Sequence, residues 1–149
     1  TVASGILDLD GVLIDSIRLN HPQGGLAFRF REGKHTMVFI TDNELGAAKG
    51  RRIPEFVEFV RGCDLLIHDA QYVPEEISER RGWGHSTYEE VVALAKEAQV
   101  HNLLLTHHDP SRSDSEEKKI VSLSREMMAA HSKLHYVDAA REGACYRLP

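Results

Sequence analysis

The sequence predicts an α/β fold in a single domain. Segments typical of β-strands alternate with segments typical of helices along the chain. The chain has 149 residues, of which 42% are hydrophobic, so it has the length of one domain and can bury a core. Neither an internal repeat nor a low-complexity linker divides it. We therefore expect one layered unit over residues 1–149.

The first elements are expected to be strands. Two short strands are predicted between residues 6 and 19, on either side of the turn signal Asp10-Gly11. Apolar and polar residues alternate at 26–31, a Glu-Gly-Lys turn follows, and residues 36–40 are mostly apolar, which predicts a β-hairpin.

The later segments alternate between the two types. They are a helix at 54–61, a strand at 64–67, a helix at 87–98, a strand at 102–106, a helix after Ser113, and strands at 134–137 and 144–148. Two of these helices begin with the pattern of a capping box, in which a hydroxyl residue is followed three positions later by Glu. The boxes are Ser86-x-x-Glu89 and Ser113-x-x-Glu116.

Composition excludes several classes of protein. The net charge of -5 and the pI near 6.0 leave no broad basic surface, which disfavours binding of long nucleic acids through their phosphates. The sequence shows neither a signal-peptide pattern nor an apolar run long enough for a membrane, so we expect a cytoplasmic protein without a membrane partner. Cys63 and Cys145 lack metal-ligand spacing and are expected to be free thiols.

Histidine or aspartate stands at the end of four strand-like runs. The runs end at His21, at Asp42, at His68-Asp69 and at His107-His108-Asp109. Ligands of α/β sheets bind at the edge where such strand ends meet, and a His/Asp set without cysteine suits a hydrolytic metal, most simply zinc. The alternative is that these polar residues only mark where the strands stop.

Four motifs resemble the later motifs of metallo-β-lactamase-fold phosphodiesterases, including the ribonuclease Z branch, in both order and spacing. The motifs are Leu-Asn-His-Pro at 19–22, Ile-Thr-Asp at 40–42, Gly-Trp-Gly-His-Ser-Thr at 82–87 and Leu-Leu-Thr-His at 104–107. The similarity covers residues 12–143, which is nearly the whole chain.

The resemblance implies a two-metal site. His21 matches the histidine on the first metal, Asp42 the carboxylate that bridges both metals, and His107 the histidine on the second metal. His85 matches a proton donor or phosphate-binding group, and Asp69 matches an acidic residue that orients it. The implied cofactors are two divalent ions, with zinc preferred over manganese or iron. The implied substrate is a small phosphodiester or nucleotide, and the low basicity makes RNA the less favoured choice.

The sequence departs from this family in one respect, because the motif His-x-His-x-Asp-His is absent and only 20 residues precede His21. The complete family fold is an αββα sandwich whose two halves both contribute ligands. This chain matches one β-sheet with its helices, the C-terminal half. Since it begins at Thr1 without methionine, we expect a fragment; a second chain that completes the site, or a homologue without activity, are the alternatives. We expect it to pair with the missing half or with itself.

Two other functions compete with this interpretation. The segment from Asp8 to Ser16 resembles the first motif of haloacid-dehalogenase-type phosphatases, with Asp8 as nucleophile, Asp10 as acid/base and Thr41 as a further motif residue. That chemistry uses magnesium, and its later motifs are poorly matched. The other alternative is an interaction module without catalysis.

Overall fold

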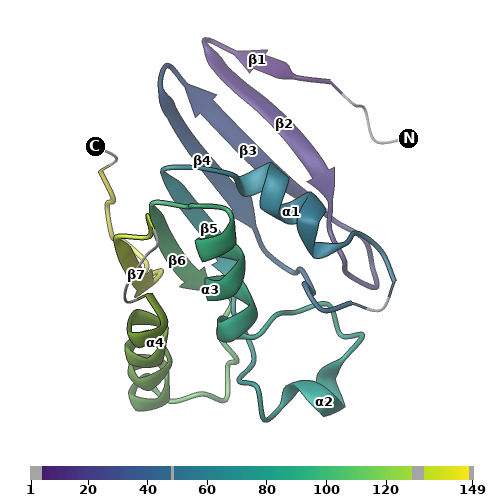
Figure 1. Cartoon of the computed structure of the whole chain (residues 1–149), viewed down its shortest axis with the longest axis vertical. Helices are drawn as coiled ribbons and strands as arrows, with labels where there is room; N and C mark the ends of the chain where they lie inside the picture. Colours follow the sequence, from purple (N-terminus) through teal and green to yellow (C-terminus); the bar gives the residue numbers. More distant parts are fainter. Residues whose placement is uncertain (1–4, 48, 129–132, 148–149) are drawn as a thin grey trace.

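The computed structural model describes residues 5–47, 49–128 and 133–147. Within these ranges seven strands form one sheet in the order of the sequence (Figure 1). The strands are β1 (Leu7–Leu9), β2 (Val12–Arg18), β3 (Leu26–Glu32), β4 (His35–Ile40), β5 (Leu65–Asp69), β6 (Asn102–Thr106) and β7 (Tyr136–Ala139). Strands β1 to β4 pair antiparallel and strands β4 to β7 pair parallel.

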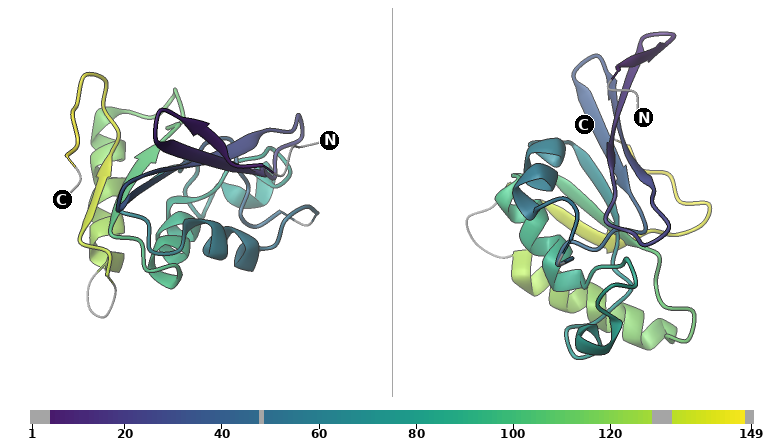
Figure 2. Two further views of the ribbon diagram at one scale, coloured as in Figure 1. Left: turned by 90° about the horizontal axis from the view of Figure 1, so that it is seen from above. Right: turned by 90° about the vertical axis from the view of Figure 1, so that its right-hand side faces the viewer.

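The parallel half of the sheet is connected through helices. The helices are α1 (Ile53–Val60), the single turn α2 (Ile77–Arg80), α3 (Tyr88–Glu97) and α4 (Asp114–Met128). Parallel crossovers are right-handed, and the order β4 to β7 advances in one direction, so α1, α3 and α4 pack on the same face (Figures 1 and 2). None of the helices in the described ranges is long and apolar enough to span a membrane. The expected α/β class is confirmed.

The two faces of the sheet differ in burial. Val38, Leu66 and Leu103 point toward the helices and are fully buried in the core. The residues next to them along the strands point to the opposite face of the sheet. On that face Phe28 of β3 pairs with Phe39 of β4, and these side chains are 37% and 39% exposed. No helix of the described residues covers this face (Figure 2). The architecture is one sheet with helices on one side, as expected for half of a sandwich.

Four strand ends meet at one edge of the sheet. Strands β4, β5 and β6 are parallel, and β2 has the same direction because β2 and β4 are each antiparallel to β3. The residues that follow these four strands therefore lie at a common edge, as the sequence predicted.

Two local predictions are wrong. The capping box of α3 is Thr87 with Glu90, one residue later than expected, because the Ser86 hydroxyl is buried and donates to the carbonyl of Asn43 (2.6 Å). The strand expected at 144–148 does not form over 144–147: this segment is exposed and extends past edge strand β7 without a ladder partner. Its last residue lies outside the described part of the chain.

Candidate metal centre

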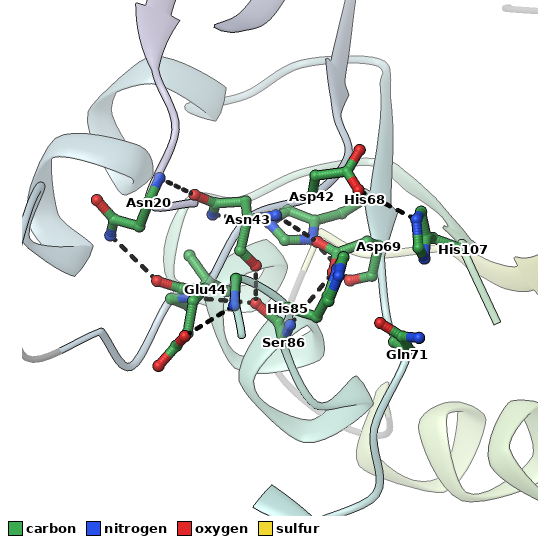
Figure 3. Close-up of polar contacts among 12 residues, drawn as sticks. Asn20, Asp42, Asn43, Glu44, His68, Asp69, Gln71, His85, Ser86 and His107 are labelled. Atoms are coloured by element: carbon green, nitrogen blue, oxygen red, sulfur yellow. Dashed lines mark hydrogen bonds and ion pairs between the residues drawn. The ribbon is translucent and has the colours of Figure 1, made fainter. Parts of the chain in front are cut away.

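Asp42 lies two residues after the end of β4 and His107 directly follows β6, and both occupy the left-handed region of backbone conformation, with φ of 56° and 55°. Residues other than glycine are uncommon there, and such strain is concentrated at functional sites. These backbone turns bring the His107 Nε2 atom to 3.1 Å from the Asp42 Oδ1 atom (Figure 3). Two of the predicted metal ligands are therefore in contact.

Two further imidazoles, those of His21 and His85, adjoin this pair. One ligand atom each from His21, Asp42 and His85 lies within 4.8 Å of the other two, a spacing that fits one metal ion. The His85 ring also stacks on the His107 ring, with centroids 4.6 Å apart. The three predicted ligands and the predicted proton donor thus converge, and their nitrogen and oxygen donors suit zinc or manganese.

Asp69 is fully buried at the end of β5 and organises the inner side of the site (Figure 3). Its carboxylate accepts hydrogen bonds from His85 Nδ1 (3.1 Å) and from the backbone N–H of Ser86 and of Asn43 (both 3.2 Å). Burial raises the pKa of Asp69, but the interactions with His68 and His85 lower it by more, so this pKa lies below its ordinary value. The carboxylate is charged and fixes the orientation of the His85 ring.

Sequence reasoning placed His68 at a strand end but gave it no role. His68 is fully buried, donates from Nδ1 to the Asp69 carbonyl (2.8 Å) and lies 3.1 Å from the Asp69 carboxylate. Its Nε2 atom faces the Asn43 side-chain amide at 3.4 Å. The sequence contains one indication of this role, because His68 is a histidine in an otherwise apolar strand and precedes the aspartate that ends it.

A glycine loop holds His85 against His21. The buried carboxylate of Glu44 accepts the backbone N–H groups of Gly82 (2.9 Å) and Gly84 (3.1 Å). At Gly84, where φ is +96°, a Cβ atom would lie 2.1 Å from the His21 ring. Glycine is therefore required for this loop to approach the metal ligand so closely.

The site opens into a hollow of about 770 Å³ beside His21. Two cationic side chains, Lys49 and Arg81, line it, and Arg81 is also paired with Glu90 at 2.6 Å. The Glu44 carboxylate also lines the hollow, 3.8 Å from Arg81, so the charge of Arg81 is balanced by its two carboxylate neighbours and Lys49 is the other cation beside His21.

Two half-buried side chains near the site have buried hydrogen-bonding atoms without partners among the described residues. They are both ring nitrogens of His108 and the Oε1 atom of Gln71, which lies below Asp69 and His107 in Figure 3. Buried polar atoms normally have partners, so these atoms are available to a water molecule or a ligand.

The alternative phosphatase site does not assemble. The Asp8 side chain accepts the backbone N–H of Gly11 (2.9 Å) and so caps the exposed turn between β1 and β2. That turn precedes β2, whereas Thr41 follows β4, so the two lie at opposite ends of the sheet. The structure overturns this alternative.

Comparisons with known proteins agree with this geometry. Residues 11–108 match the sequence profile of a family described as Beta-lactamase superfamily domain. Ribonuclease Z of Halalkalibacterium halodurans is 32% identical over 90 residues, covering 57% of this chain and 28% of that protein. Ribonuclease Z of Brevibacillus brevis is 40% identical over 80 residues, covering 54% of this chain and 23% of that protein.

The fold is shared with solved structures. The metallo-β-lactamase fold protein YhfI from Bacillus subtilis superposes with a TM-score of 0.74 at 22% identity, covering 95% of this chain and 50% of that one. The short form of human tRNase Z gives 0.65 at 21% identity, covering 96% and 46%. The chain therefore spans half or less of the length of these four proteins.

Proposed function

The chain belongs to the β-lactamase superfamily, and we propose that it supplies one side of a two-metal site that hydrolyses a phosphodiester. The observation that carries this proposal is the convergence of His21, Asp42, His85 and His107 at one sheet edge. Two relatives carry the name ribonuclease Z, which supports a phosphodiester as substrate.

The roles follow from the donor atoms. His21 would bind one metal, His107 the other, and the Asp42 carboxylate would bridge them, because two close cations need a shared anionic ligand. When bound, the metals supply an activated water and polarise the phosphate. The bridging role is supported by the position of Asp42, which contacts His107 and also belongs to the group with His21.

His85 is assigned as the proton donor to the leaving oxygen. Its Nδ1 atom is held by the buried carboxylate of Asp69, so the Nε2 atom is left to face the substrate side. A histidine with one nitrogen fixed by a carboxylate has the arrangement of a general acid. The same ring also fits the metal-capable group, so the experiment must separate the two roles.

The rest of the site is proposed to come from a His-x-His-x-Asp-His segment, either elsewhere in the same polypeptide or in another chain. A hydrolytic zinc has three protein ligands and an open position, and the three predicted ligands cannot provide this for two ions. The unpartnered His108 nitrogens and the uncovered sheet face are consistent with such a second half.

The test compares His85→Ala with Asp42→Ala in the enzyme completed by that segment, using bis(p-nitrophenyl) phosphate and a short RNA as substrates. We expect His85→Ala to lower turnover about 10²- to 10⁴-fold while metal content stays near that of the unmodified enzyme. Asp42→Ala should lose both metals. Loss of metal in His85→Ala would make His85 a ligand, and full metal content in Asp42→Ala would exclude the bridge. An unmodified completed enzyme without hydrolysis would favour the interaction module.

A further inference from the structure

A continuous row of rings and one guanidinium leads from the candidate metal centre to the surface. The His85 ring, stacked on His107, makes an edge contact with the Tyr72 ring, whose centroid is 5.9 Å away. The Arg80 guanidinium lies over Tyr72, 5.3 Å from the ring centroid, and also over Trp83, 5.1 Å from that centroid. The row therefore ends on the indole of Trp83.

The outer end of this row is exposed while its inner part is fixed. Trp83 is 58% exposed, whereas Tyr72 is 1% exposed. Arg80 is held near Asp109, at 3.8 Å, and the backbone N–H of Trp83 donates to the Arg80 carbonyl (3.1 Å). Arg80 thus occupies one face of the indole, and more than half of the Trp83 surface faces solvent.

We infer that Trp83 is a stacking platform for the base of the nucleoside that carries the reacting phosphate, an inference that rests on the proposed function. Only one residue separates Trp83 from His85, so their Cα atoms lie at most about 7 Å apart, and the row of contacts through Tyr72 and Arg80 links their side chains. Bases of every kind offer a π-face, so the platform accepts nucleotides without selecting a sequence.

This platform also provides binding affinity for a nucleotide in a chain whose negative net charge attracts phosphates only weakly. A net charge of -5 gives little general attraction for phosphates. Stacking on Trp83 contributes affinity that does not depend on neutralising a long backbone. The platform therefore selects nucleotide phosphodiesters over phosphodiesters of aliphatic alcohols.

Trp83 is the single tryptophan of this chain, so its fluorescence reports on the platform directly. The experiment titrates the chain with adenosine 5′-monophosphate and, in parallel, with ribose 5-phosphate, which has the same phosphate and sugar but no base. We expect saturable quenching by adenosine 5′-monophosphate and none by ribose 5-phosphate. Free N-acetyltryptophanamide under the same conditions corrects for absorption by adenine.

Two variants test the role of the ring itself, with nucleotide affinity measured by ligand-observed NMR. Trp83→Leu should weaken binding of adenosine 5′-monophosphate about tenfold, whereas Trp83→Phe, which keeps an aromatic face, should stay within about threefold of the unmodified chain. Far-UV circular dichroism confirms that both variants fold. Equal binding of the two probes, or unchanged affinity in Trp83→Leu, would overturn the inference.

The outcome is separable from that of the proposed function. Hydrolysis of bis(p-nitrophenyl) phosphate by the completed enzyme, together with base-independent binding, would leave the proposed function standing and remove the platform. Base-dependent binding that requires Trp83, without hydrolysis by the completed enzyme, would retain a nucleotide site and remove the proposed reaction.

Discussion

Strain at single residues shapes the candidate site. Asp42 and His107 both adopt positive φ within two residues of the ends of β4 and β6. Each such residue costs on the order of 1–3 kcal/mol and persists only where the surroundings enforce it. Here the two turns let side chains from β4 and β6 meet at 3.1 Å above the sheet edge. The conformations are therefore part of how the donors are positioned.

Gly84 offers a test of this positioning with a matched control. Gly84 and Gly82 both have positive φ and both donate to Glu44, but a Cβ atom would strike His21 only at Gly84. We expect Gly84→Ala to weaken metal binding in the completed enzyme about 10- to 100-fold, because His21 must move. Gly82→Ala should introduce backbone strain at positive φ without a contact to His21, so the metal affinity of the enzyme should stay unchanged. Isothermal titration with zinc measures both, and equal losses would show that strain rather than the contact with His21 matters.

The two thiols should differ sharply in reactivity. Burial raises the pKa of Cys63 to about 12, so almost none of its thiolate exists near neutral pH, whereas Cys145 is exposed. Ellman's reagent should therefore titrate one thiol quickly in the native chain and two after unfolding. A Cys145→Ser variant should show no fast thiol. Fast reaction of Cys63 in that variant would mean that the core opens readily.

At the scale of elements, the start of α3 is tied to the site. The N-cap of α3, Thr87, immediately follows Ser86. The Ser86 hydroxyl donates a hydrogen bond to the carbonyl of Asn43 and accepts one from the backbone N–H of Leu45, both in the loop after Asp42. Ser86 is the one residue between His85 and the cap, and its hydrogen bonds hold it in place. Helix, loop and site should form one cooperative unit.

The cap of α3 should contribute measurably to stability. The Thr87 hydroxyl accepts the backbone N–H of Glu90, and the Glu90 carboxylate accepts the backbone N–H of Thr87. We expect Thr87→Ala to lower the free energy of unfolding by about 1 kcal/mol, and Thr87→Ser to lower it by less. Urea unfolding followed by circular dichroism measures the difference. Equal stability of the alanine and serine variants would argue against the hydroxyl as the cap.

At the scale of the whole molecule, the sheet has one face without a helical layer in the described ranges. This face carries Phe28 and Phe39, both more than a third exposed. Apolar surface of this kind normally marks an interaction site. The second half of the site proposed above would pack against this face.

The chain by itself should therefore bind zinc weakly. We expect residues 1–149 alone to hold less than one zinc per chain and to show no hydrolysis of bis(p-nitrophenyl) phosphate, since each metal would have one histidine and a shared carboxylate. Addition of a segment with His-x-His-x-Asp-His should restore both metal content and turnover. Elemental analysis and a turnover assay, with and without the segment, provide the measurements. Strong metal-dependent hydrolysis by a monomer of residues 1–149 would refute the half-site proposal.

Local sequence patterns determined the α/β class, the order of most elements and the strand ends that carry donors. These features depend on side-chain period and turn residues, which neighbouring positions specify. The family motifs added His85 and Asp69 as a pair, and the structure places them in hydrogen-bonding contact.

Only the tertiary structure decided features that depend on residues far apart in sequence. Both Ser86 and Thr87 can cap a helix. Thr87 does so because the Ser86 hydroxyl donates a hydrogen bond to the carbonyl of Asn43, 43 positions earlier. The buried contacts of His68 and the close approach of Gly84 to His21 have the same origin. Contacts of this kind exist only once the sheet edge has assembled, because hydrogen-bond and steric geometry between distant segments is set by the fold and not by local spacing.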